Sequence, residues 1–205
     1  MVNLAKNNYQ QILEQLLSSI KLKQITPSLL LHCCCAPCSS YVLEYLSSYF
    51  DITLLFYNPN IYPETEYQFR KDELKRLVSE MGLSAKINFI EDNYEPELFF
   101  SMSKGLESCV EGSTRCFKCY YLRLFKTATL AAKNNFDYFT TTLTVSPHKN
   151  ADKLNEIGKQ LSDQFGINYL FSDFKKKDGY KRSIELSKKY NLYRQNYCGC
   201  EFSKR

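Results

Sequence analysis

The chain has 205 residues, of which 44% are hydrophobic and 24% are charged, values typical of one globular domain. Seven glycines and six prolines exclude collagen-like and glycine- or proline-rich low-complexity proteins. The net charge of +5 is mild. The unusual feature is the number of cysteines: nine are too few for a small disulfide scaffold, and an odd number cannot pair completely within the chain.

The first residues lack the apolar core of a secretory signal, and no run approaches the roughly 20 apolar residues of a membrane span. We therefore expect a cytoplasmic protein with no membrane partner. The cytoplasm keeps thiols reduced, and clustered cysteines there more often bind metal or carry out redox chemistry than form structural bridges.

Hydrophobic spacing predicts alternating helices and strands. A helix over residues 3–24 precedes a buried strand over 28–32, and Ser39 or Ser40 is expected to cap a helix that runs to about Tyr49. The later elements, in chain order, are a strand (52–57), a helix (63–81, ended by Gly82), a strand (87–90), two helices (97–103 and 117–134), a strand (138–143), a helix (150–165), a strand (167–171) and a basic helix (180–190). This alternation predicts a single α/β domain with a mostly parallel, Rossmann-like sheet covered by helices on both faces.

In such sheets, functional groups collect in the loops at the carboxyl ends of the strands. Four segments follow predicted strands: residues 33–38, 58–60, 144–149 and 173–177. We expect these segments to share one rim of the domain.

Eight of the nine cysteines fall into three groups. The first is Cys33, Cys34, Cys35 and Cys38; the second is Cys116–x–x–Cys119; the third is Cys198–Gly199–Cys200. A C-x-x-C pair together with the cysteine-rich loop suits either zinc or an iron–sulfur cluster, and spacing alone leaves both open. Cys109 stands apart and is expected to be a small buried hydrophobic residue.

The pair Cys198 and Cys200 is a different kind of site, because one intervening glycine permits only a tight, strained ring that is readily reduced. We interpret it as a dithiol that exchanges electrons. The alternative is a flexible tail with two incidental thiols, although Tyr197 and Phe202 are positioned to hold the tail in place.

Basic residues concentrate near the C-terminus. Residues 175–194 contain eight basic and two acidic residues, a net charge of +6, so the rest of the chain sums to about −1. The segment suits a polyanion such as nucleic acid, or is simply a solvated helix face. The candidate nucleic-acid contacts are Lys175, Lys176, Lys177, Lys181, Arg182 and Arg194.

Five further side chains are less specific signals. His148 lies in a polar loop, where it is a candidate proton donor or phosphate ligand as well as a solvated residue. His32 is expected to be a core residue that is hydrogen-bonded below the cysteine loop. The three remaining residues are expected to bind phosphate or to support helix faces: Arg70, Arg115 and Arg123.

Five motifs together resemble the cobalamin-independent epoxyqueuosine reductases of the QueH type. They span about residues 29–203 and read HCCCAPC (32–38), NPNIYP (58–63), RCFKC (115–119), TTLTVSPHK (141–149) and YRQNYCGC (193–200). The resemblance implies a nucleotide-hydrolase-like (HUP-type) α/β fold and reduction of epoxyqueuosine to queuosine at the wobble position of tRNA. It also divides the chain into an N-terminal helical extension (1–27) and one catalytic domain (28–205).

The same resemblance implies a [4Fe-4S] cluster held by Cys34, Cys35, Cys116 and Cys119. Some members hold a further iron beside the cluster, with an aspartate where this chain has Cys38, so Cys38 ligates that iron, replaces it or is spare. Cys198 and Cys200 match the family's redox-active disulfide. The partner implied is tRNA, and neither Cys33 nor the external electron donor is assigned.

Two other functions remain open. A zinc-stabilised RNA-binding module without catalysis explains the clustered thiols and the basic segment but not Cys198–Gly199–Cys200. An ATP-dependent tRNA-modifying ligase or thiolase needs a glycine-rich phosphate loop after the first strand. Here that loop is residues 33–38, and all seven glycines lie elsewhere.

Overall fold

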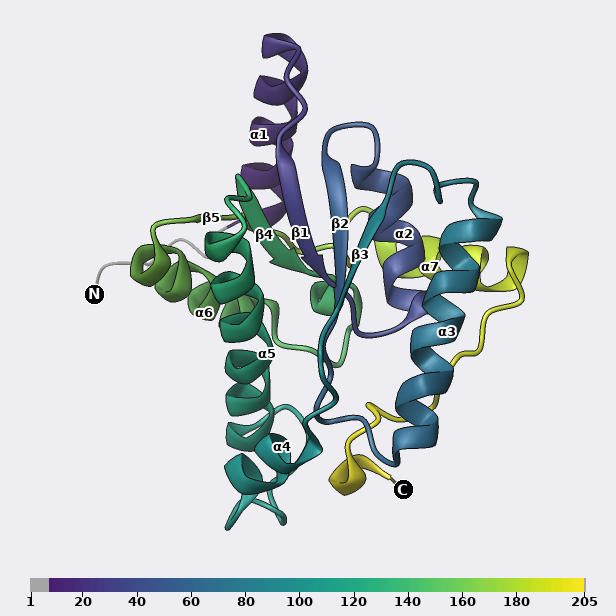
Figure 1. Ribbon diagram of the computed structural model, residues 1–205, viewed down its shortest axis with the longest axis vertical. Helices are drawn as coiled ribbons and strands as arrows, with labels where there is room; N and C mark the ends of the chain where they lie inside the picture. Colours follow the sequence, from purple (N-terminus) through teal and green to yellow (C-terminus); the bar gives the residue numbers. More distant parts are fainter. Residues whose placement is uncertain (1–7, 205) are drawn as a thin grey trace.

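The computed structural model describes residues 8–204, which form a parallel five-stranded sheet with helices on both faces (Figure 1). The strands lie in the order β3-β2-β1-β4-β5, and every neighbouring pair is parallel. They are β1 (Ser28–His32), β2 (Asp51–Phe56), β3 (Asn88–Glu91), β4 (Tyr138–Thr141) and β5 (Asn168–Tyr169). This is the doubly wound order, which confirms the predicted fold class.

The helices are α1 (Tyr9–Lys23), α2 (Ala36–Leu46), α3 (Glu64–Glu80), α4 (Pro96–Ser103), α5 (Thr114–Lys133), α6 (Ala151–Phe165) and α7 (Gly179–Lys189). Two short 3₁₀ turns, η1 (Thr142–Val145) and η2 (Glu201–Ser203), complete the described elements. In Figure 1, α2 and α3 lie on one side of the sheet, and α5 and α6 lie on the other.

The sheet has a hydrophobic core on each face. Leu29 and Leu31 of β1 pack into the core that contains side chains of α1, α2 and α3. Leu30, between them, packs into the second core, with side chains of α5 and α6. Because neighbouring residues of a strand point to opposite faces, both faces of β1 must be apolar, which explains its unbroken run of leucines.

The predicted N-caps of α2 are wrong, since this helix begins at Ala36 with Cys35 as its N-cap. Pro37 fits the first turn because it has no main-chain N–H to leave unpaired. The Ser39 hydroxyl instead donates to the Cys35 carbonyl at 2.8 Å, and the Ser40 hydroxyl donates to the Pro37 carbonyl at 2.8 Å. The earlier start places the cysteine loop directly at the helix N-terminus.

Other boundaries also differ from the predictions. Helix α5 begins at Thr114 rather than at residue 117, so Cys116 and Cys119 both lie in its first two turns. Strand β4 ends at Thr141 and passes directly into η1. The predicted start of the first helix, residue 3, lies outside the described residues.

Helix α1 is part of the main core. Its Leu13, Leu17 and Ile20 are buried in the same cluster as β1 and β2. The proposed domain boundary at residue 28 stays a prediction. None of the helices between residues 8 and 204 has the length and apolar character that crossing a membrane requires.

Helix α6 meets the sheet closely at Gly158. A Cβ atom at this position would lie 2.3 Å from the ring of Tyr169 in β5. We expect Gly158→Ala to lower the free energy of unfolding by about 1–3 kcal/mol, the usual cost of overpacking. Chemical denaturation measures this change. The matched control is the neighbouring surface substitution Lys159→Ala, expected to change stability by less than about 0.5 kcal/mol, and equal effects of the two would refute the contact.

Candidate metal and redox site

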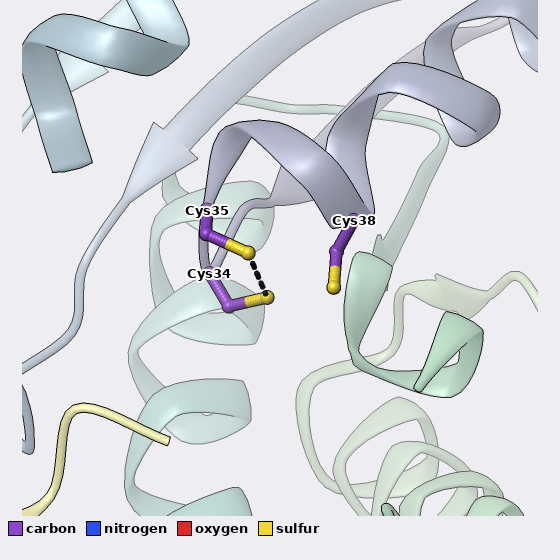
Figure 2. A group of neighbouring side chains, drawn as sticks. All are labelled: Cys34, Cys35 and Cys38. Atoms are coloured by element: carbon purple, nitrogen blue, oxygen red, sulfur yellow. Dashed lines mark hydrogen bonds between the residues drawn. The ribbon is translucent and has the colours of Figure 1, made fainter. Parts of the chain in front are cut away.

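The turn between β1 and α2 gathers three thiols. The sulfur atoms of Cys34, Cys35 and Cys38 all lie within 4.8 Å of one another and could hold a metal ion. Figure 2 shows the three side chains turned toward one another, with Cys34 and Cys35 Sγ 3.7 Å apart. Cys35 is extended at the helix N-terminus, and Cys38 stands one turn into α2. Sulfur ligands of this kind suit zinc, copper(I) or iron–sulfur clusters.

The three thiols share their protons unequally. Hydrogen bonds from Cys34 and Cys38 hold the pKa of Cys35 well below its usual range. Giving hydrogen bonds to Cys34 and Cys35 raises the pKa of Cys38. The helix N-terminus beside Cys35 also favours a thiolate. Cys35 is therefore the first of the three to ionise, as a metal ligand must.

Cys33 faces the other way. It is fully buried in the core, its thiol donates to the Leu31 carbonyl at 3.6 Å, and burial raises its pKa. It acts as a small hydrophobic residue. Cys109, predicted to be buried, is only half-buried, so that prediction is wrong.

Helix α5 carries the second pair. The Gly112 N–H donates to Cys116 Sγ at 3.2 Å, and burial raises the pKa of Cys119 to about 12. Cys119 belongs to a buried cluster with Phe99 and Cys200 rather than to the tight thiol group of the β1–α2 turn. The four predicted cluster ligands thus come from two segments, the β1–α2 turn and α5, and Cys34 and Cys116 both pack against the core on the α5–α6 side of the sheet.

The C-terminal tail is held in position. The Tyr62 N–H donates to the Gly199 carbonyl at 2.9 Å, and Arg70 Nη1 donates to the Cys198 carbonyl at 3.2 Å. Arg70 also lies over the ring of Tyr197, 5.2 Å from its centroid. Gly199 has φ +97°, and a Cβ atom there would come within 3.0 Å of Arg70, so this position requires glycine. Cys198 and Cys200 are both free thiols.

The two tail thiols have different surroundings. Lys149 Nζ lies 3.3 Å from Cys198 Sγ and 2.9 Å from a carboxylate oxygen of Glu111. Burial lowers the pKa of Lys149, but Cys198, Tyr120 and Glu111 together raise it more, so the ammonium stays charged. Burial raises the pKa of Cys200 to about 11. Cys198 therefore has a neighbouring cation, whereas Cys200 keeps its proton.

Sequence reasoning missed Lys149, although its place at the end of the loop after the fourth strand was an available signal. The neighbouring His148 is exposed at the pocket. His32 is buried as predicted, with Nδ1 2.8 Å from Thr141 Oγ1 and Nε2 3.1 Å from the Tyr57 carbonyl. Burial lowers the pKa of His32 to about 4, so its ring is neutral at pH 7.

Three arginines are buried around the cysteines. Arg70 pairs with Glu66 at 2.7 Å, and Arg115 Nη1 donates to the carbonyls of Leu106 and Glu107 at 2.8 Å each. The third, Arg123, connects α5 to the loop after β2. Of the two predicted roles for these arginines, support of the fold agrees with their burial.

One pocket of about 320 Å³ lies between the β1–α2 turn and the C-terminal tail. Cys34, Cys35 and Cys38 line it from the β1–α2 turn, and Cys198 and Lys149 line it from other segments. Two of the four loops expected at a common rim, 33–38 and 144–149, therefore meet here. The loop 58–60 is joined to them because Asn58 Nδ2 donates to the Cys33 carbonyl at 2.9 Å. Residues 173–177 are joined to the segment after β4, because the Lys175 N–H donates to the Thr144 carbonyl at 3.2 Å, although none of them lines this pocket.

The basic segment is only partly available to a ligand. Lys175 pairs with Asp173, Lys177 with Glu14, and Arg182 with both Glu44 and Glu185. Lys176 and Lys181 have no side-chain partner within residues 8–204. Arg194 lines the pocket and lies over the ring of Tyr180, 6.0 Å from its centroid.

Comparison with known proteins gives one consistent family. A family model described as "Epoxyqueuosine reductase QueH" matches residues 29–205. Proteins of that name from Streptococcus pyogenes serotype M1 and Staphylococcus epidermidis are 42% and 43% identical, each over 97% of this chain and over 78% and 85% of their own lengths. One from Thermotoga maritima is 35% identical over 86% of this chain and 90% of its own.

Among solved structures, an NMN synthetase from Francisella tularensis aligns with 93% of this chain and 75% of its own. The TM-score is 0.48 and the sequence identity is 12%.

The neighbours Cys33 and Cys34 provide a matched pair of substitutions. We expect Cys34→Ala to lower the amount of metal bound, because its sulfur belongs to the thiol group of the pocket. Cys33→Ala is expected to leave metal content unchanged and to lower the free energy of unfolding by about 1–2 kcal/mol, since it removes a buried side-chain atom. Metal analysis and chemical denaturation measure the two effects. Metal loss in Cys33→Ala would contradict the assignment of Cys33 to the core.

Proposed function

The chain belongs to the QueH family of epoxyqueuosine reductases, and on that premise we propose that it reduces epoxyqueuosine to queuosine at the wobble position of tRNA. The protein is an oxidoreductase. The reaction removes the epoxide oxygen as water and leaves an alkene, so each turnover consumes two electrons and two protons.

The proposed cofactor is a [4Fe-4S] cluster with Cys34, Cys35, Cys116 and Cys119 as ligands. The residues present fit it, because soft sulfur donors stand beside buried arginines that balance their negative charge. Cys34 and Cys35 from the β1–α2 turn and Cys116 and Cys119 from α5 would hold the cluster between these two segments. When bound, the cluster supplies electrons one at a time. Cys38, within the tight thiol group, is the proposed ligand of an additional iron.

Cys198 and Cys200 are the proposed redox pair. Oxidation of two thiols to one disulfide releases two electrons and two protons, which equals the demand of epoxide removal. Lys149 Nζ lies 3.3 Å from Cys198 Sγ, and burial raises the pKa of Cys200 to about 11, so Cys200 retains its proton at pH 7. An external reductant then restores the dithiol. His148, exposed at the pocket, is the proposed proton donor to the departing oxygen.

The proposed substrate contacts come from the basic segment, of which Arg194 lines the same pocket. Lys175, Lys176, Lys177, Lys181, Arg182 and Arg194 are the proposed phosphate-binding residues. We rank Lys176, Lys181 and Arg194 first, because acidic side chains already bind the others. Tyr180, which lines the pocket, and Tyr62, which is 41% exposed, are the proposed stacking partners of unpaired bases of the anticodon loop. A tRNA substrate places the reaction in the cytoplasm.

The observation that carries this proposal is the pocket with thiols on two of its walls, three from the β1–α2 turn and Cys198 from the tail. A zinc-stabilised RNA-binding module needs only the first group. A reductase needs both, because electrons must reach a substrate that sits between the donors.

The first test is reduction of epoxyqueuosine-containing tRNA by reconstituted protein with a chemical electron donor, followed by nucleoside analysis. We expect Cys119→Ala to lose bound iron and activity together. Cys198→Ala is expected to keep its iron and to lower turnover at least tenfold. Cys109→Ala, a cysteine outside the pocket, is the control and is expected to match the wild type. Loss of iron in Cys198→Ala would show that the tail ligates the metal and that the assignment is wrong.

The second test concerns tRNA affinity and salt. Phosphate contacts release counterions, so affinity is expected to fall steeply as ionic strength rises. Lys181→Ala is expected to weaken binding and to reduce the magnitude of the slope of log affinity against log salt by about 1, the contribution of one phosphate contact. Lys159→Ala, on α6, removes the same charge as a control. An unchanged slope in Lys181→Ala would remove this residue from the interface.

A further inference from the structure

Arg123 is the most unusual charged residue of the site. Its side chain is 1% exposed. Nε donates to the Cys119 carbonyl at 3.3 Å, and Nη1 donates to Asn58 Oδ1 at 3.4 Å. Nη2 is buried and has no hydrogen-bond partner. Within residues 8–204, no carboxylate forms an ion pair with this guanidinium.

The other buried cations of the pocket differ from Arg123. Arg70 has the carboxylate of Glu66 and Lys149 has that of Glu111. Arg115, which does not line the pocket, also lacks a carboxylate; its Nη1 donates to two main-chain carbonyls, and its buried Nε has no hydrogen-bond partner. A buried charge without a counter-charge destabilises a fold. Within residues 8–204, Arg123 is therefore a buried cation of the pocket that has no carboxylate partner.

Thiols share the surroundings of the guanidinium. Arg123 Nε donates to the Cys119 carbonyl at 3.3 Å, and Arg123 lines the pocket together with Cys34 and Cys198. A guanidinium keeps its proton in a protein, so this group is positively charged. Cys119 comes from α5 and Cys34 from the β1–α2 turn, so Arg123 interacts with both groups of proposed ligands.

We propose that Arg123 is the buried counter-cation of the cysteine-bound cluster, and that its unpartnered Nη2 donates to a sulfur of the cluster or of its ligands. The inference rests on the cluster of the proposed function. Reduction adds one negative charge to the cluster, and a fixed positive charge beside it favours that state. Arg123 is thus a positioning residue that raises the reduction potential, as hydrogen bonds to cluster sulfurs generally do.

The first experiment measures the midpoint potential of the reconstituted protein by redox titration with electron paramagnetic resonance. We expect Arg123→Gln to make one-electron reduction about tenfold less favourable, equivalent to about 59 mV lower. Arg123→Lys keeps the charge, and its midpoint potential is expected to fall by less than half as much as that of Arg123→Gln. The control is Lys126→Gln, which removes a positive charge from the same helix. Lys126 already pairs with Asp92, so the midpoint potential of this variant is expected to equal that of the wild type.

The second experiment measures thermal unfolding with and without iron. In the iron-free protein, Arg123→Met removes an uncompensated buried charge, so its Tm is expected to equal or exceed that of the wild type. Loading iron is expected to raise the Tm of the wild type more than that of the variant. A merely structural Arg123 would instead lower the Tm of the variant equally with and without iron.

The outcomes separate the two claims. A wild type that loads iron, together with Arg123→Gln at an unchanged potential, overturns the role of Arg123 alone. A lower Tm of iron-free Arg123→Met than of the iron-free wild type also overturns the role of Arg123. This outcome can be read even if Arg123→Gln fails to load iron. A wild-type protein that takes up no iron overturns the cluster of the proposed function, and the inference falls with it.

Discussion

The short turn between β1 and α2 is the constraint on which the site depends. Strand β1 ends at His32 and α2 begins at Ala36, so three residues must leave a buried sheet and enter a helix. All three are cysteines. Cys33 packs into the same core as Leu29 and Leu31 of the strand. Cys34 and Cys35 remain at the carboxyl edge of the sheet, where their sulfurs lie close to that of Cys38 in the first turn of α2. The position of the thiols follows from the backbone path.

Charge balance is the second determinant of the site. The pocket brings together thiols that ionise when they bind metal and cations that the fold has buried beside them. Arg70 and Lys149 have carboxylate partners, and both also contact Cys198, one through the main chain and one through the sulfur. Arg123 has no carboxylate partner in the described part of the chain. The protein therefore presents a surplus of buried positive charge to the place where an anionic cofactor is proposed.

Much of the architecture was predictable, because apolar runs such as residues 28–32 and helical spacing depend on local sequence. The rim position of the loop 33–38 followed from the parallel sheet, and the burial of His32 from its place at the strand end. The start of α2 was not predicted, since Ser39 and Ser40 are good caps in isolation and only the position of Pro37 and Cys35 in the fold decides between them.

The electrostatic environment could not be predicted in the same way. Lys149 and Cys198 are 49 residues apart, and their contact exists only because the tail is held by Arg70 and Tyr62. The missing counter-charge of Arg123 depends on every side chain packed around it. The division of the predicted ligands between the β1–α2 turn and α5 likewise depends on where the two helices pack, and spacing within a motif carries no information on it.

Metal and sulfide analysis of the protein isolated without oxygen tests the central claim most directly, since it reports what the buried thiols hold. The account predicts a brown protein with about four acid-labile sulfides per chain and about five irons, four in the cluster and one at Cys38. A colourless protein with one tightly bound zinc and no iron would contradict it.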